Sequence, residues 1–156
     1  MDTKVFLIGI LTLTFGAFLV SFAAAAQNYS TINEFFGDIP NLSTELQSKE
    51  VIIPDSVGFL ISNGNILASI SMNDDSMKEF YFVAEDKKIT GIFSGKPDKY
   101  KYVISTDEDT ANEILKSENQ LDSILSNYDK GNIKLKAVGV GNKFKLFFAK
   151  IFLKFK

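Results

Sequence analysis

The carboxyl-terminal quarter of the chain, from Gly131 to Lys156, most constrains the possible folds. Residues 133–137 alternate apolar side chains with lysines, which predicts a half-buried strand. Two glycines, Gly139 and Gly141, end the alternation, and an aromatic helical pattern follows. One helix face carries Phe144, Phe148, Ile151 and Phe155, is widened by Phe147 and Phe152, and is flanked by Lys143, Lys145, Lys150, Lys154 and Lys156. Such a helix has to cover a core, a lipid-filled cavity or a membrane surface.

The residue types that are absent exclude several classes of site. The chain has no Cys, His or Trp, and all 17 of its basic residues are Lys. Zinc sites built on Cys or His and triads that use His are therefore excluded. The lack of Arg argues against bidentate phosphate recognition. We expect no enzyme, no cofactor and no metal.

Charge is divided unevenly along the chain. Residues 27–129 hold 8 Lys and 18 acidic residues, a net charge of −10, whereas residues 130–156 hold 8 Lys and no acidic residue. The acidic body argues against nucleic acid as a partner. The basic end can dock on its own acidic domain, or it can contact an anionic membrane.

The amino-terminal segment is apolar. Val5 to Ala26 is a run of 22 residues without a charge, which would span roughly 33 Å as a helix. We predict a transmembrane anchor over residues 1–26. A cleaved signal peptide is the alternative, since Ala24 and Ala26 form an A-x-A site. Lys4 precedes the run, so the positive-inside rule places the following domain outside the cytoplasm, at the cell membrane or, after cleavage, secreted.

Residues 27–50 are polar, and we interpret them as a linker. Pro40 limits a continuous helix, so only one or two short helical turns are expected. Sequons at Asn28 and Asn41 fit an exported stalk. The folded domain is predicted to cover residues 51–156.

Residues 57–106 predict an antiparallel β-sheet meander within an α+β fold, covered on one face by helices. Asn63 and Gly64 mark a hairpin turn. Alternation puts Phe80 and Phe82 on one face, and it groups Ile89, Gly91 and Phe93 on one face. Thr106 is expected to cap an acidic helix start, and a second helical pattern includes Leu121, Ile124, Leu125 and Tyr128.

The carboxyl half resembles the sterol carrier protein 2 family, in the form of a membrane-anchored member of prokaryotic or archaeal type. The similarity is carried by VIST at residues 103–106, GNIKLK at 131–136, Gly139, and residues 145–149. It covers about residues 57–153. We predict no amphipathic helix ahead of the sheet, which departs from that family. The resemblance implies an α+β domain that encloses an apolar tunnel for lipids or acyl chains.

From this resemblance we expect binding, or transfer, of an apolar lipid or of an acyl or isoprenoid chain. The alternative is an interaction or scaffolding module without a ligand. Gly139 and Gly141 could also suggest a phosphate-binding loop, but a strand-to-helix turn that needs glycine backbone freedom is the stronger interpretation. The candidate lipid-binding residues are Phe80, Phe82, Phe93, Ile114, Leu125, Tyr128, Phe144, Phe148 and Phe152. The candidate membrane contacts are Lys143, Lys145, Lys150 and Lys154.

Overall fold

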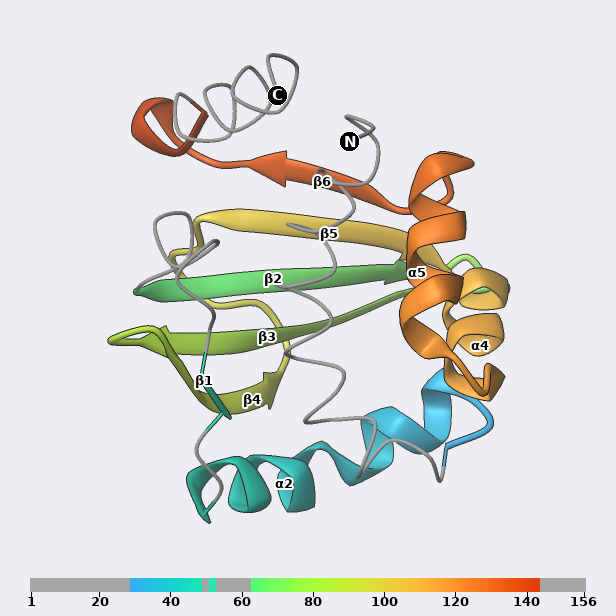
Figure 1. The fold of residues 1–156 in the computed structure, drawn as a ribbon, viewed down its shortest axis with the longest axis horizontal. Helices are drawn as coiled ribbons and strands as arrows, with labels where there is room; N and C mark the ends of the chain where they lie inside the picture. Colours follow the sequence, from blue (N-terminus) through green and yellow to red (C-terminus); the bar gives the residue numbers. More distant parts are fainter. Residues whose placement is uncertain (1–28, 49–50, 53–62, 144–156) are drawn as a thin grey trace.

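A computed structural model describes residues 29–48, 51–52 and 63–143, apart from the side chains of Leu121 and Leu125 (Figure 1). The predicted anchor (1–26), the first strand of the predicted hairpin (57–62) and the aromatic helix (144–156) lie outside these residues. None of the helices in the described ranges is long and apolar enough to cross a membrane. The elements in chain order are α2 (Ile32–Ser48), β1 (Val51–Ile52), β2 (Gly64–Ser71), β3 (Met77–Glu85), β4 (Lys88–Ser94), β5 (Tyr102–Asp107), α4 (Glu108–Lys116), α5 (Gln120–Asp129) and β6 (Lys134–Ala137).

The strands form a six-stranded mixed sheet in the order β1-β4-β3-β2-β5-β6. Consecutive strands β2, β3 and β4 pair antiparallel, so the meander prediction is correct for these three. It is wrong for β5, which pairs parallel with β2. The reason lies in residues 95–101, which carry the chain back to the start of β2 and do not form a hairpin. Lys101 N donates to Asn65 O over 2.9 Å, and Asn65 Nδ2 donates to Lys99 O over 2.8 Å.

A β-bulge in β4 changes which side chains share a face. Ala84 pairs with Ile89 and Val83 pairs with Gly91, which leaves Thr90 as an extra residue. Ile89 therefore faces the buried core with Phe82, while Phe93 faces the opposite side beside Tyr81. The predicted grouping of Ile89 with Gly91 and Phe93 is wrong because the extra residue, Thr90, reverses the face on which the side chains before it lie.

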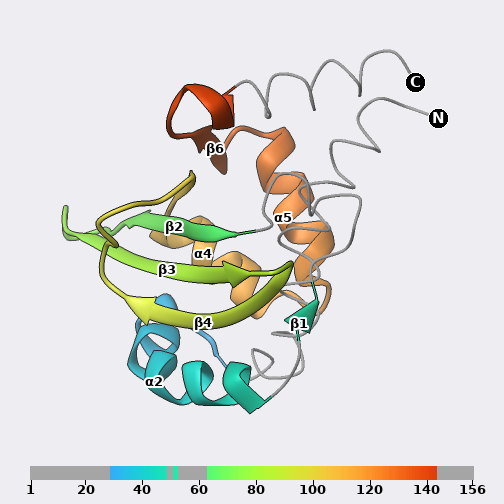
Figure 2. The ribbon, with the colours of Figure 1, turned by 90° about the vertical axis from the view of Figure 1, so that its left-hand side faces the viewer.

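Helix α2 occupies most of the segment that we predicted to be a linker. It runs for 17 residues, and it lies beneath β4 in Figures 1 and 2. Thr31 Oγ1 accepts from Glu34 N over 3.2 Å, and Glu34 Oε2 accepts from Thr31 N over 3.2 Å, so the helix begins with a capping box. Its buried apolar stripe repeats at alternating spacings of three and four residues: Ile32, Phe35, Ile39, Leu42 and Leu46.

The prediction of short helical turns is therefore wrong, and an amphipathic helix does precede the sheet. Pro40 is tolerated inside α2 because it lies on the exposed side, away from the buried stripe. The second sequon lies within this helix, where Asn41 is exposed and Ser43 is buried. Asn28 of the first sequon lies outside the described residues.

Helices α4 and α5 complete the cover of the sheet. Asp107, and not Thr106 as predicted, caps α4 by accepting from Thr110 N over 2.8 Å. Thr106 still belongs to β5, and its hydroxyl donates to Asn132 O over 3.1 Å. The apolar faces of α2, α4 and α5 join one core with one face of the sheet, which confirms the predicted one-sided cover for the described helices.

Candidate functional site

The predicted aromatic face of the sheet forms a closed core. Phe80 packs against Phe35 and Phe36 of α2, with ring centroids 5.2 and 5.4 Å apart, and against Phe82 at 5.2 Å. Lys78 extends its ammonium group to 5.1 Å from the centroid of the Phe36 ring. Both Phe80 and Phe82 are buried. These rings pack edge to face at core distances, so helix α2 covers the sheet where the lipid tunnel was expected.

The structure brings some of the other predicted lipid-binding residues together and separates one from them. Ile114 belongs to the same core as Phe80 and Phe82, and Tyr128 packs against that core. Burial, followed by the nearby Asp129 carboxylate, raises the pKa of Tyr128. Phe93 lies on the opposite face of the sheet with 39% of its surface exposed. The remaining candidates fall outside the described atoms: the Leu125 side chain, Phe144, Phe148 and Phe152.

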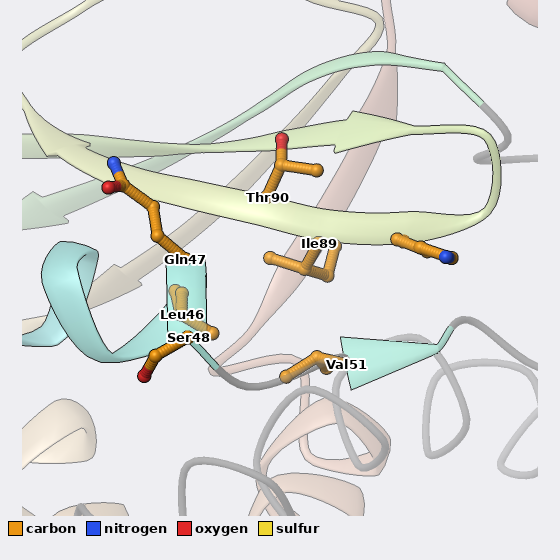
Figure 3. Close-up of a pocket in the computed structure, with 7 residues that line it drawn as sticks. Leu46, Gln47, Ser48, Val51, Ile89 and Thr90 are labelled. Atoms are coloured by element: carbon orange, nitrogen blue, oxygen red, sulfur yellow. The ribbon is translucent and has the colours of Figure 1, made fainter.

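A hollow of about 400 Å³ lies where the end of α2 meets β1 and the start of β4. Figure 3 shows Leu46, Val51 and Ile89 converging from these three elements. All three side chains are buried, and they form the apolar wall of the hollow. The rim is polar and consists of Gln47, Ser48, Lys88 and Thr90. We call this feature the α2–β1–β4 hollow.

Sequence reasoning missed this hollow because its walls come from parts of the chain that are far apart. Val51 reaches Ile89 through the short β1–β4 ladder. Leu46 is the last member of the α2 stripe, which the linker interpretation discarded. The capping signature of Thr31 and Glu34, together with that stripe, could have revealed the helix. The pairing of β1 with β4 has no comparable local signal.

A second hollow, of about 430 Å³, lies at the junction of α4 and α5. Gln120 is buried at its edge and donates from Nε2 to Leu115 O over 3.3 Å. The Gln120 Oε1 atom has no protein partner, but it is also inaccessible to solvent, so it does not face the hollow. The other lining residues are mostly polar: Tyr29, Ser30, Leu115, Lys116, Ser117 and Glu118.

The acidic residues that precede and begin α4 hold structure together. Besides the Asp107 cap, Glu108 Oε2 accepts from Asn73 N over 2.8 Å, and Asp109 Oδ1 accepts from Asn73 Nδ2 over 3.0 Å. They therefore fasten the β2–β3 turn to α4. Among the residues that the structure describes, no cluster of acidic side chains is arranged to hold a metal ion.

The two glycines after β6 differ in their need for glycine backbone freedom. Gly139 has φ of +84°, which confirms its need for glycine backbone freedom. Gly141 has no such angle and lies in the first helical residues after the turn, where an added Cβ atom would meet nothing within 4 Å. Its predicted backbone role is therefore wrong. Lys143 is exposed, whereas Lys145, Lys150 and Lys154 lie outside the described residues.

Asn127 is a buried polar residue that the sequence analysis overlooked. Its Nδ2 donates to Glu113 Oε1 over 3.1 Å and to Ser123 O over 3.0 Å. Its Oδ1 accepts from Asn132 Nδ2 over 2.9 Å. The side chain thus joins α4, α5 and the turn that leads to β6.

Comparisons with known proteins complete the description of the site. No protein-family model and no curated protein matches the sequence. Among solved structures, sterol carrier protein 2 from Yarrowia lipolytica in its apo form has 14% identity and a TM-score of 0.36, over 48% of this chain and 62% of that one. The chain thus spans less than two thirds of that protein.

Two further solved structures are similar. Palmitated SCP2L2 from Aedes aegypti has 10% identity and a TM-score of 0.39, over 57% of this chain and 71% of that one. UbiJ-SCP2, a ubiquinone synthesis protein, has 8% identity and a TM-score of 0.36, over 75% and 92%. Because these TM-scores lie below 0.5, we assign the chain to no family. The candidate site is therefore supported by the geometry of this chain alone.

Proposed function

We propose that this domain is a binding protein, not an enzyme, and that it takes the apolar chain of a lipid into the α2–β1–β4 hollow. The observation that carries the proposal is the convergence of Leu46, Val51 and Ile89 beneath a polar rim (Figure 3). A volume of about 400 Å³ lies within the usual range of small-molecule sites. An apolar floor with a few polar groups at its edge suits a molecule with one greasy and one polar end.

Binding would be driven by the transfer of hydrocarbon out of water. Each CH₂ group buried against the wall contributes about 0.8 kcal/mol before the cost of ordering the chain. The rim offers hydrogen-bonding groups and the Lys88 ammonium for a polar head. A tunnel between the sheet and its helices contributes little to this proposal, because Phe80 and Phe82 pack against one another and Phe80 packs against α2 in that space.

We further propose that the domain acts at a membrane. The support is in the sequence: an uncharged run from Val5 to Ala26, Lys4 in front of it, and a carboxyl end with lysines and no acidic residue. Residues 27–156 would then lie outside the cytoplasm and remain tethered. Protease added to intact cells should remove them, and a domain that stays protected would contradict this orientation.

Photo-crosslinking tests the lipid site in the full chain. Membranes that contain the protein are given a fatty acid with a diazirine in its chain, irradiated, and analysed by peptide mass spectrometry. Crosslinks should concentrate on peptides that contain Leu46, Val51 and Ile89. Val51→Phe should fill the hollow and remove them, while Ile52→Phe is the matched control on the adjacent, exposed position. Thermal unfolding checks that both variants fold.

The alternative function is a scaffolding or interaction module without a lipid. The closed aromatic core around Phe80 favours it, because that core needs no ligand to complete its packing. A folded wild-type protein that gives no crosslinks in any part of the domain would support this alternative. Equal crosslinking of Val51→Phe and wild type, or crosslinks outside the peptides that line the hollow, would show that the lipid does not occupy the hollow.

A further inference from the structure

The turn between β6 and the residues that follow it exposes apolar side chains. Val140 has 72% of its surface exposed and Val138 has 38%. The turn is fixed in shape, because Val138 N donates to Lys101 O over 2.7 Å and Gly139 holds a left-handed backbone conformation. The backbone of the turn therefore holds both valine side chains in fixed, exposed positions.

The charges around this turn are almost entirely positive. Lys136 and Lys143 are exposed on its two sides. The acid-free stretch from residue 130 to 156 contains both. The connection from residue 95 to 101, which is bonded to Val138 through Lys101, has three lysines and one acidic residue. An apolar tip within a basic surface is complementary to an anionic bilayer, which offers head groups to lysines and hydrocarbon to valines.

Two other exposed apolar residues, Met77 and Ile52, lack this setting. Met77 is 56% exposed, but the turn just before it carries Asp74 and Asp75. Ile52 is 60% exposed, and Glu50 and Asp55 lie close to it in sequence. Acidic neighbours would be repelled by an anionic surface. Phe93 is 39% exposed, but it lies within β4 beside Tyr81 and not at a turn. The Val138–Val140 tip combines exposure, a turn and positive charge.

We propose that the tip formed by residues 138–140 inserts into an anionic lipid leaflet while Lys136 and Lys143 contact its head groups. This inference rests on the proposed function at a membrane and adds the element that orients the domain. Insertion would place the β6 edge of the sheet against the bilayer. The hollow lies at the opposite side of the sheet, at the edge strand β1 and its neighbour β4, so the two sites can be tested separately.

The absence of Trp from the sequence supplies a direct probe. Val140→Trp places a single indole at the tip, and Met77→Trp is the matched control on another exposed residue. The full chain is reconstituted in vesicles of phosphatidylcholine, with or without phosphatidylglycerol, that contain brominated lipid. The Val140→Trp emission should shift to shorter wavelength and be quenched when phosphatidylglycerol is present. The effect should weaken in 1 M salt, and also when Lys136 and Lys143 are both changed to Glu.

The Met77→Trp variant should stay unquenched in both types of vesicle. The inference is overturned if Val140→Trp remains unquenched in anionic vesicles. It is also overturned if the blue shift follows protein density without bromolipid quenching, which would indicate contact with a second copy. The chain also has no Cys, so Val140→Cys with a nitroxide label gives an independent reading of depth from its accessibility to oxygen. If the fatty acid crosslinks to the hollow while position 140 stays in water, only this inference fails. If no lipid crosslinks, the lipid-binding function fails whatever position 140 does.

Discussion

Replacing Asn127 should reveal how much the buried polar network contributes to stability. The side chain is fully buried, with 0% of its surface exposed, and it links three parts of the fold through hydrogen bonds. Asn127→Leu keeps a similar volume but removes the bond to the Glu113 carboxylate and leaves Asn132 Nδ2 without its acceptor. A bond to a charged group contributes about 1.5–3 kcal/mol and a neutral one about 1 kcal/mol. Since Glu113 is exposed, we expect a loss of about 2–3 kcal/mol.

Asn127→Asp separates the network from simple packing. The new carboxylate would take the place of the amide nitrogen that now lies 3.1 Å from Glu113 Oε1, so two like charges would meet. Burial and this repulsion should raise the folded-state pKa of the new Asp above its unfolded value of about 3.9. A raised folded-state pKa means that the folded state binds more protons as the pH falls. The variant should therefore gain stability relative to wild type as the pH falls from 7 towards that unfolded value.

Urea unfolding of the full chain in a non-ionic detergent, followed by circular dichroism, measures these changes. Glu113→Gln is the control: combined with Asn127→Asp, it replaces repulsion by an amide donor and should restore part of the stability at pH 7. The combined variant should also lose most of the stabilisation on acidification. If Asn127→Leu is as stable as wild type, or if Asn127→Asp is indifferent to both pH and Glu113→Gln, the hydrogen-bond network does not support the fold as described.

Two further predictions concern single positions. Gly139→Val should lower the free energy of unfolding by about 1 kcal/mol or more because of the positive φ, whereas Gly141→Ala should be neutral or slightly stabilising; equal losses at both would refute the distinction. Burial raises the pKa of Tyr102 to about 12, so the folded protein holds its phenol proton more tightly than the unfolded chain, whose pKa is about 10. Stability should therefore fall as the pH rises from 10 through 12, and Tyr102→Phe should lack that part of the fall in thermal unfolding; a parallel fall in both proteins would contradict the assignment.

The strands were predictable because each carries its own pattern. Phe80 and Phe82 alternate with less buried neighbours along β3, and Leu135 alternates with lysines along β6, so local periodicity locates them. The mixed topology was not predictable in this way. The pairing of β5 with β2 depends on where residues 95–101 lead the chain, and that depends on contacts such as Lys101 with Asn65. Local sequence does not encode such a contact.

Helix α2 was not predicted because Pro40 was given more weight than the apolar stripe along residues 32–46. Proline disfavours a helix interior because it lacks an N–H group and its ring crowds the preceding turn. Here the buried stripe of α2 supplies tertiary packing that offsets this cost, and Pro40 sits outside the stripe. Because helix α2 was not predicted, the hollow was not predicted either, since Leu46 belongs to the buried stripe of that helix. Asn127 was missed for another reason. Its hydrogen-bond partners Glu113 and Asn132 lie in other elements, and the local helical pattern does not show that the Asn127 side chain contacts them.

The bulge in β4 permits a final test of which residues face the core. Thr90 is the extra residue, so its deletion leaves Ala84 opposite Ile89, Val83 opposite Gly91 and Phe82 opposite Ile92 in a regular ladder. Every core side chain keeps its face, and we expect a loss within the common range of about 0.5–3 kcal/mol. Deletion of Gly91 also removes the bulge, but it moves a side chain into the glycine position.

A Cβ atom at the Gly91 position would lie 2.7 Å from the ring of Phe93, so that second deletion should cost more. Chemical denaturation of the two deletion variants compares them directly. If the face assignments were those of unbroken alternation, deleting Thr90 would turn Ile89 out of the core and unfold the domain. Milder destabilisation by loss of Thr90 than by loss of Gly91 is therefore the result that fixes Ile89 in the core, and with it the wall of the proposed lipid site.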